Sequence, residues 1–383
     1  MNGKRITEID GLRGFLALWV FVCHSILYAN YPTKLPGPLE FWRAAWHAVD
    51  LFVIITGFSM WFLLDHTKER YFTYLGKRFF RLYPVYIVLF LIGIPVALLE
   101  FKGNELLGQP VANLQSWFSN LWKHIGLHAV MLHGVVPKTA APPEATFAFL
   151  PPAWFVSYVW QFYLVAPLLF LFNRSHGRFI FYGLLCAATV WFRNNLPQVP
   201  VGAFLPFHIE YLFYGALSYK IVKACSEREI KIPVPLTAGA VVLSLLLFPQ
   251  YKQLFLPTPI FLAKSDWWLP VSLWLIFFSM LLDVHFGKLD IVSNALSRWI
   301  NSKPMQFFGR ISYSFYLVHA LVIVSVRTLV AMKYPELSKA VWLTVLVVLS
   351  FPASLGLSVV LHRWVEIPGA KLGKRMMGST GSL

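Results

Sequence analysis

Charged residues are scarce in this sequence. Only 13% of its 383 residues are Asp, Glu, Lys or Arg, whereas soluble domains carry roughly a quarter. Hydrophobic residues make up 57% of the chain and aromatic residues 17%. A soluble protein would have too few polar side chains here to cover its surface, and so many aromatic residues also exclude a disordered chain. These proportions predict a polytopic membrane protein.

Cysteine is also scarce, with Cys23, Cys186 and Cys225 as the three cysteines of the chain. Three separated cysteines give no disulfide framework and match no metal-binding spacing. Lys4 and Arg5 precede the first apolar stretch, and no cleavage pattern of small residues follows it. We therefore expect an uncleaved first span rather than a signal peptide. The sequence contains no internal repeat.

Long apolar runs predict spanning helices, since a helix needs about 20 apolar residues to cross a bilayer. Strands of a barrel would alternate polar and apolar residues, and these runs do not. We predict an all-α, polytopic integral membrane helical bundle with about ten transmembrane helices. The predicted spans are 14–30, 47–65, 84–101, 154–173, 179–194, 205–222, 232–248, 268–284, 311–332 and 340–362. Residues 1–368 would form the transmembrane domain and 369–383 a short basic cytoplasmic tail.

The net charge of +16 raises the question of a nucleic-acid partner. A nucleic-acid-binding protein gathers its basic residues in a patch, but here they are dispersed between apolar runs, so we expect no such partner. Alternate connections between the predicted spans carry about twice as many Lys and Arg residues as the others, and connections rich in these residues stay in the cytoplasm. This bias predicts that both termini are cytoplasmic.

The first predicted span contains Arg13 and, eleven residues later, His24. Eleven residues make about three helical turns and rise about 16 Å, so both side chains lie on one helix face. Ionisable groups inside a membrane are costly and are functional candidates by default. A histidine at mid-membrane can accept and return a proton, and an arginine at the inner mouth can attract an anion. A hydrogen-bonded core histidine and a topology-setting arginine are the alternatives.

Two more groups of ionisable residues accompany the next two spans. Arg78 and Arg81 are three residues apart, so one helical turn directs both guanidinium groups to the same side. This spacing suits a phosphate clamp, although basic residues at a membrane edge also set topology or contact lipid headgroups. Asp50 enters the second span, where it can orient His24, bind a hydroxylated substrate or form a structural ion pair.

The longest connection, about 102–153, contains three histidines. His124 and His128 are four residues apart and would share one face of a helix. With His133 they could bind a metal. An amphipathic helix on the outer membrane surface, anchored by Trp117 and Trp122, is the simpler interpretation, and we predict no metal site.

Five segments in chain order carry a resemblance to a known family. They are Ile9-Asp10-Gly11-Leu12-Arg13-Gly14 with His24, Asp50-Leu51-Phe52 through Gly57-Phe58, Arg78-Phe79-Phe80-Arg81-Leu82-Tyr83-Pro84, Gly309-Arg310-Ile311-Ser312-Tyr313-Ser314-Phe315-Tyr316-Leu317-Val318-His319, and Val365-Glu366-Ile367-Pro368. Together they resemble the motifs of the acyltransferase 3 family of bacterial membrane acyltransferases. The resemblance extends from residue 9 to residue 368.

This resemblance implies an enzyme that transfers acyl groups other than aminoacyl groups. Its reaction would be O-acylation, with acetyl the expected group, from cytoplasmic acyl-CoA to a hydroxyl of an extracytoplasmic or lipid-linked carbohydrate such as a polysaccharide. The enzyme would lie in the bacterial cytoplasmic (inner) membrane, in contact with membrane lipid. His24 would be the general base, Arg13 would position the donor or stabilise developing charge, and Asp50 would orient His24 or the acceptor. An acyl-His intermediate is equally compatible.

The resemblance also implies binding residues. Arg78 and Arg81 would hold the phosphates of CoA. Substrate contacts would come from Trp154, Gln161, Tyr316, His319 and Glu366. The family often has Ser and Glu where this chain has Phe155 and Val159, so we expect this chain to seat its acceptor differently.

Two other classes of function remain alternatives. One is a proton-coupled secondary transporter or exporter with a relay of His24, Asp50, His208, Glu210 and Arg327, although the repeat symmetry and paired broken helices typical of transporters are not evident. The other is a catalytically inert membrane protein that binds lipid or a protein partner.

Overall fold

Helices make up nearly all of the regular structure. The computed structural model describes residues 6–30, 34–137, 145–195, 203–248, 250–256, 258–260, 262 and 266–378. In those ranges the extended structure is one antiparallel pair of two-residue strands, β1 (Leu35–Pro36) and β2 (Pro259–Ile260). The all-α prediction is confirmed for this part of the chain. Lys4, Arg5 and the last five residues of the predicted tail lie outside the described residues.

Seven helical segments in the described ranges are long and apolar enough to cross a membrane, and they match seven of the ten predicted spans. The chain is therefore a polytopic membrane protein by the composition and length of its helices. The seven segments are α1 (Thr7–Tyr28), α3 (Trp46–His66), α4 (Tyr71–Leu106), the run Pro151–Arg174 around α7 (Trp154–Phe170), α12 (Trp268–Phe286), α14 (Lys303–Ala331), and the run Lys339–Met376, which includes α15 (Lys339–Leu361) and α16 (Ile367–Met376).

The other three predicted spans coincide with helices that fall short of this standard. These helices are α8 (His176–Asn195), α9 (Ile209–Glu227) and α10 (Thr237–Leu247). With 11 residues, α10 is about 16 Å long, roughly half the apolar thickness of a bilayer. It begins at Thr237, where the Asp283 carboxylate accepts hydrogen bonds from the backbone N–H groups of Leu236 and Thr237 at 2.8 and 2.9 Å. A total of ten spans is therefore not established.

The chain divides into two compact units, each with its own core. Unit 1 comprises the described residues up to His66 together with Tyr211–Ser312, and unit 2 comprises Thr67–Glu210 together with the described residues from Tyr313 onward. The boundary falls inside α14.

In unit 1, α1 packs against α3 and α2 (Gly37–Arg43), and α12 packs against α3 and α10. Close helix contact in this unit depends on glycine: a Cβ atom on Gly57 of α3 would collide with the backbone oxygen of Leu212 in α9, and one on Gly215 of α9 would collide with that of Ile54. The remaining short elements are α11 (Tyr251–Leu254) and α13 (Ile291–Ile300), which begins with a capping box formed by Asp290 and Ser293.

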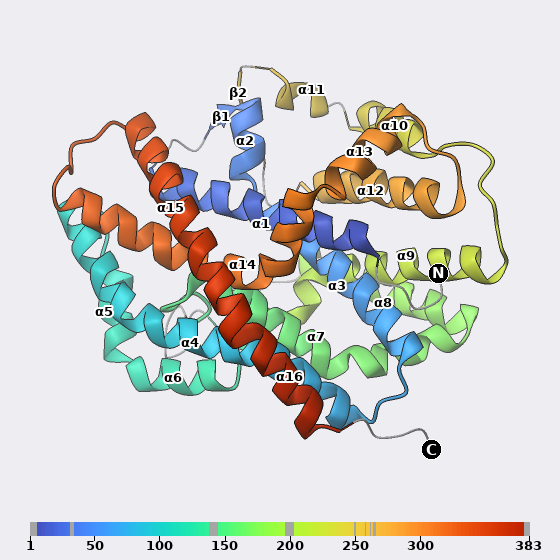
Figure 1. Cartoon of the computed structure of the whole chain (residues 1–383), viewed down its shortest axis with the longest axis horizontal. Coiled ribbons are helices and arrows are strands. Elements are labelled where there is room, and N and C mark those ends of the chain that lie inside the picture. The colour runs from blue at the N-terminus through green and yellow to red at the C-terminus, as the bar shows by residue number, and fades with distance from the viewer. Residues whose placement is uncertain are drawn as a thin grey trace. The chain divides into compact units, whose positions relative to one another are not determined.

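In unit 2, α4 is the longest helix, with 36 residues, and it packs against α6 (Leu121–Ala129), α7 and α16. Figure 1 shows α15 and α16 following each other along one line, with α4 beside α16. The five-residue turn η5 (His362–Glu366) joins α15 to α16 and has π-helical hydrogen bonding. The other short elements are α5 (Ala112–Ser119), η1 (His133–Val135), η2 (Pro151–Ala153), η3 (Leu171–Arg174) and η4 (Leu205–His208).

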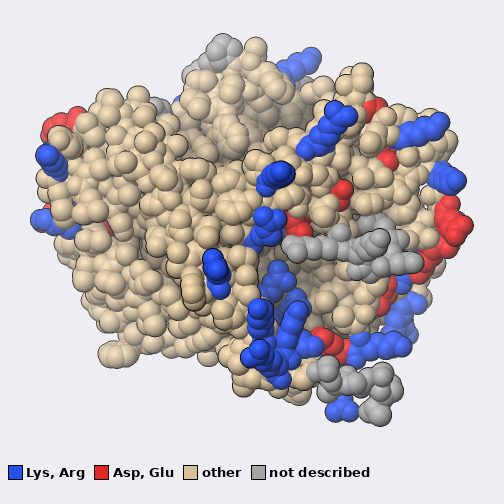
Figure 2. All heavy atoms as spheres, viewed as in Figure 1, with Lys and Arg blue, Asp and Glu red and all other residues tan. Residues whose placement is uncertain are grey.

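The surface is consistent with a lipid environment. Large apolar side chains are exposed on α8, α10 and α15, among them Leu184, Leu246 and Val348, which are 63%, 73% and 61% exposed. Figure 2 shows that most of the visible face carries no charged residue. In water such a surface would be an aggregation liability, whereas in a bilayer it is solvated by the acyl chains.

Candidate functional site

Arg13 and His24 lie on one uninterrupted helix, as the sequence predicts. Both belong to α1, which runs from Thr7 to Tyr28. The Nδ1 atom of His24 is 3.0 Å from the carbonyl oxygen of Val20. A carbonyl can only accept, so Nδ1 carries the proton and Nε2 carries the lone pair. This is the tautomer that a general base requires.

Arg13 is held in place by two side chains of unit 1. Its guanidinium donates a hydrogen bond of 2.8 Å to the Ser59 hydroxyl of α3, and it lies 3.4 Å from the carboxylate of Asp10, one turn earlier in α1. Ser59 was not singled out by the sequence motifs, because its relation to Arg13 depends on the packing of α1 against α3. The arginine is thus oriented by side chains from α1 and α3.

Asp50 is buried in the first turns of α3, the helix that packs against α1. Its carboxylate lies 3.5 Å from Nδ1 of His47. The C-terminal half of α1 is covered by the segment around α2, because the indole N–H of Trp19 donates to the carbonyl oxygen of Phe41 and the thiol of Cys23 to that of Arg43, both at 2.8 Å. Arg13, His24 and Asp50 are therefore all placed on two packed helices of unit 1.

Arg78 and Arg81 lie on α4 in unit 2, one turn apart. Within the described residues neither guanidinium has a hydrogen-bond or ion-pair partner, and the Nε atom of Arg78 is buried without an acceptor. Leaving a buried guanidinium nitrogen without an acceptor is costly, so Arg78 is well suited to bind an anion, and the exposed Arg81 one turn later can contribute to the same site. The neighbouring Lys77, in contrast, is paired with Glu69 at 2.5 Å.

The basic helix α16 is packed tightly on the arginine-bearing part of α4. A Cβ atom on Gly369 would lie 2.7 Å from the Pro84 ring, and one on Gly373 would lie 2.5 Å from the Phe80 side chain. Glycine at these two positions, one turn apart, therefore allows α16 to approach α4 closely. The exposed residues Lys371, Lys374 and Arg375 lie on the other faces of α16, and Figure 2 shows Lys and Arg side chains gathered over its C-terminal turns.

Glu366 lies at the end of η5, where its carboxylate is bound by two donors. The Ser314 hydroxyl of α14 donates to Oε2 of Glu366 at 2.7 Å, and Nδ1 of His362 lies 2.9 Å from the same oxygen. The adjacent Tyr313 donates through its hydroxyl to the carbonyl oxygen of Leu82 at 2.6 Å. The sequence indicated Glu366 but gave no sign of these partners, because Ser314 lies 52 residues away.

Gln161 and Trp154 are both on α7, but they differ in surroundings. The Gln161 amide donates to the carbonyl oxygens of Ser157 and Ala203 at 3.1 and 2.7 Å and accepts from the backbone N–H of Leu205 at 3.1 Å. It thus fixes the backbone that precedes η4. Trp154 lies 6.3 Å from the ring of His208, measured between ring centres.

Tyr316 and His319 are adjacent on α14 and are both buried. The Tyr316 ring meets Phe155 edge to face, with 5.8 Å between ring centres, and lies 6.1 Å from the His319 ring. Nδ1 of His319 donates to the carbonyl oxygen of Phe315 at 3.2 Å. Phe155, which stands where the family often has Ser, is therefore close to Tyr316 and His319 in unit 2. Gln161, in contrast, forms its hydrogen bonds with backbone groups.

The three histidines of the long connection are fully buried, and two of them, His128 and His133, contact α4. The Tyr86 hydroxyl lies 2.7 Å from Nδ1 of His128 and 3.3 Å from Nδ1 of His133, whose rings are stacked with centres 3.9 Å apart. Burial lowers the pKa of His133 to about 3 and that of His124 to about 4. Because the rings of His128 and His133 are stacked, their nitrogen lone pairs lie in parallel planes and do not converge on one point. Within the described ranges, no group of three His, Cys, Asp or Glu side chains is arranged to hold a metal ion.

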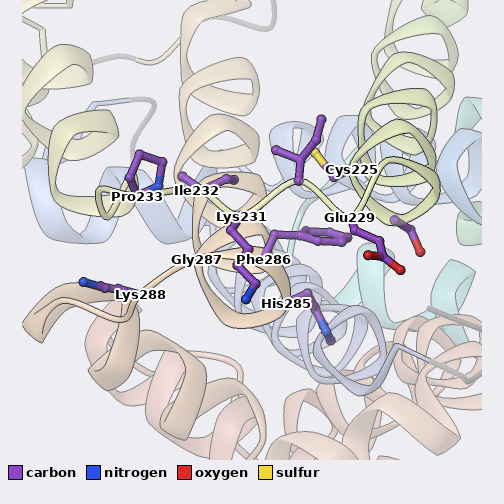
Figure 3. Close-up of a pocket in the computed structure, with 11 residues that line it drawn as sticks. Cys225, Glu229, Lys231, Ile232, Pro233, His285, Phe286, Gly287 and Lys288 are labelled. Atoms are coloured by element: carbon purple, nitrogen blue, oxygen red, sulfur yellow. The ribbon is translucent and has the colours of Figure 1, made fainter.

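An open pocket of about 570 Å³ lies in unit 1, between the loop that follows α9 and the end of α12. Figure 3 shows Lys231 and His285 on neighbouring parts of its wall, with Lys288 at one end. His285 also lies 3.5 Å from the carboxylate of Glu8 in α1. None of the residues predicted as catalytic or substrate-binding lines this pocket.

Comparison with known proteins agrees with the motifs. The model of the acyltransferase 3 family, described as an acyltransferase domain, matches residues 6–363. The chain is also 26% identical over 174 residues to acyltransferase MdmB of Streptomyces mycarofaciens, a match that covers 45% of this chain and 41% of that protein. No solved structure matches the chain. Because the family match covers nearly the whole sequence, the chain belongs to the acyltransferase 3 family of non-aminoacyl acyltransferases.

Proposed function

We propose that this protein transfers an acyl group, most simply acetyl, from cytoplasmic acyl-CoA to a hydroxyl group of an extracytoplasmic or lipid-linked carbohydrate. The observation that carries this proposal is the state of His24 on α1. Its Nδ1–H donates to the carbonyl oxygen of Val20, which leaves the lone pair on Nε2. In a family of acyltransferases, a histidine oriented in this way is suited to activate an acceptor hydroxyl.

The reaction at His24 follows from this orientation. Nε2 accepts the hydroxyl proton of the sugar while the hydroxyl oxygen attacks the thioester carbonyl carbon and forms the new C–O bond. The resulting oxyanion collapses, the C–S bond breaks, and the departing CoA thiolate takes the proton back from the imidazolium. Arg13, held by Ser59 and Asp10, stabilises the negative charge that develops in this sequence or positions the donor.

Donor binding is assigned to Arg78 and Arg81. CoA is a polyanion, and two guanidinium groups one turn apart match the spacing of its phosphate oxygens. Both lack a partner in the described part of the chain, so an incoming phosphate would not have to displace an internal carboxylate. This role requires the start of α4 to face the cytoplasm, and the distribution of basic residues supports both termini being cytoplasmic. The resemblance to bacterial membrane acyltransferases supports a location in the bacterial inner membrane.

The transporter alternative receives no comparable support. Glu210 is paired with Arg193 at 2.8 Å, and Arg327 donates to the Asn104 side chain at 2.7 Å. These two members of the supposed relay therefore have structural partners. Ion-coupled uptake into vesicles without consumption of acyl-CoA would nevertheless establish that alternative over the enzyme.

The proposed chemistry is tested with purified protein in vesicles, labelled acetyl-CoA and extracted surface polysaccharide as the acceptor. Release of free CoA and transfer of label to the polysaccharide are measured together. His24→Ala and Arg13→Ala should each lower turnover by at least about a hundredfold, the usual contribution of a general acid–base residue. The exposed His66 in unit 1 provides a matched control, and His66→Ala should retain activity. Near-normal turnover in His24→Ala would show that another group is the base.

Donor binding is tested separately by equilibrium titration with CoA. The double variant Arg78→Ala, Arg81→Ala should weaken CoA binding by about a hundredfold, because each lost charged hydrogen bond accounts for roughly tenfold. Arg174→Ala, which removes an exposed arginine of the same unit, should bind CoA normally. Unchanged affinity in the double variant would remove these arginines from the donor site.

A further inference from the structure

The turn η5 has an unusual backbone that determines where Glu366 points. The N–H of Ile367 donates to the carbonyl oxygen of His362, five residues earlier, which is the hydrogen bond of a π-helical turn. Pro368 follows at once and has no N–H group, so it cannot make the ordinary bond to Trp364. The wider turn brings the side chains of His362 and Glu366 together on the side that faces Ser314 of α14.

Only one of the two oxygen atoms of the Glu366 carboxylate has hydrogen-bond partners among the residues that the structure describes. Its Oε2 atom accepts from both Ser314 and His362, whereas Oε1 has no partner among the residues that the structure describes. The side chain is 12% exposed, so Oε1 is accessible yet largely screened from solvent. An ionised carboxylate oxygen in such a position is a strong acceptor for a ligand N–H or O–H group.

The cluster is not a nucleophile triad. Ser314 donates a hydrogen bond to Oε2 of the Glu366 carboxylate, and among the residues that the structure describes no hydrogen bond joins Ser314 to the imidazole of His362. The serine is therefore not paired with an imidazole base, and its contact holds Oε2 in place while Oε1 stays accessible. A binding role fits these contacts better than a covalent one.

Glu366 is close to the arginine pair along α4. Helix α16 runs antiparallel to α4, with Gly373 against Phe80 and Gly369 against Pro84, so Glu366 is level with the turn that follows Pro84. That level is one to two turns from Arg81, or about 5–10 Å at 1.5 Å per residue. Arg81 and Glu366 also both lie within electrostatic reach of the Tyr313 hydroxyl.

We infer that Oε1 of Glu366 binds the pantetheine arm of the acyl donor, accepting a hydrogen bond from the hydroxyl or amide N–H group at its phosphate-proximal end. This inference rests on the proposed function, since it takes acyl-CoA as the ligand. With the phosphates on Arg78 and Arg81, these donor groups follow after roughly 5–8 Å of extended chain, which is comparable to the offset of about 5–10 Å between Arg81 and Glu366 along α4. The carboxylate thereby selects for the pantetheine arm rather than for the nucleotide.

The test compares two ligands of the full-length protein in detergent: CoA, and phosphoadenosine diphosphate, which is the nucleotide half of CoA and lacks pantetheine. In Glu366→Gln the amide oxygen can keep the contacts with Ser314 and His362, and the amide N–H₂ then faces the ligand as a donor. We expect Glu366→Gln to weaken CoA binding by about tenfold or more and to leave binding of the nucleotide half unchanged within about twofold. Retained binding of the nucleotide half also shows that the variant is folded.

Controls separate this inference from the proposed function. Glu105→Gln changes an exposed carboxylate of the same unit and should bind both ligands normally, whereas the double variant of Arg78 and Arg81 should lose both. If Glu366→Gln binds CoA as the wild type does, or loses both ligands equally while folded, the inference is overturned. If Glu366→Gln does not fold, Glu366→Asp decides by the same comparison, because it keeps the charge but withdraws it from the ligand. Wild-type protein that binds neither ligand would instead refute the proposed function.

Discussion

Replacing His124 with leucine should make the protein less sensitive to acid. His124 is fully buried beside Phe149, and neither of its ring nitrogens has a hydrogen-bond partner among the described residues. Burial in these apolar surroundings lowers its pKa to about 4. The folded protein therefore holds a neutral imidazole at a pH where the unfolded chain would already bind a proton.

The size of the effect follows from this difference in proton binding. A histidine in the unfolded chain has a pKa of about 6.5. Because the folded-state pKa is lower, stability is complete above pH 6.5 and decreases as the pH falls, by about 1.4 kcal/mol per pH unit for each such histidine, until the folded-state pKa is reached. At pH 5 the loss due to His124 is about 2 kcal/mol. Burial also lowers the pKa of His128 and of His133, so both add to the acid destabilisation in the same direction.

The assay is unfolding of the purified protein in detergent at pH 7.5 and at pH 5. His124→Leu should reduce the difference in unfolding free energy between these two conditions by about 2 kcal/mol. The exposed His176 of unit 2 provides the control, and His176→Leu should leave the difference unchanged. Equal pH dependence in the wild type and His124→Leu would refute the assignment of a buried neutral imidazole.

Three further substitutions test contacts that the tertiary structure revealed. Ser59→Ala removes the 2.8 Å hydrogen bond from the Arg13 guanidinium. In turnover assays it should lower the rate of acyl transfer about tenfold, and in thermal unfolding it should leave the melting temperature unchanged. Unchanged turnover would show that Arg13 needs no such support. Gln161→Leu leaves the carbonyl of Ala203 and the N–H of Leu205 without their partner and should cost about 2 kcal/mol of stability, which an unaltered unfolding midpoint would contradict. Gly369→Leu places a side chain against Pro84 and should lower the free energy of unfolding by about 1–3 kcal/mol. It should also weaken CoA binding, because α16 is displaced from α4. Normal CoA affinity would show that this packing is dispensable.

The sequence predicted those features that depend on neighbouring residues along one helix. Apolar length and composition identified the helical membrane class, and the spacing of Arg13 and His24 placed both on one face of α1, which the structure shows as a single helix. The same reasoning failed to settle the number of spans. Helix α10 has only 11 residues, because its start is fixed at Thr237 by the carboxylate of the distant Asp283, although the hydropathy of that stretch alone resembles a full span.

The candidate site depended on tertiary structure wherever its contacts join distant segments. The bonds from Ser59 to Arg13, from Ala203 to Gln161 and from Ser314 to Glu366 join residues 46, 42 and 52 positions apart. Such pairs are brought together by helix packing, which no local spacing encodes. That the buried Nε atom of Arg78 has no acceptor among the described residues is likewise a property of the folded environment. Sequence thus determined which residues carry suitable chemistry, whereas packing decided which of their atoms are held by the protein and which remain for a ligand.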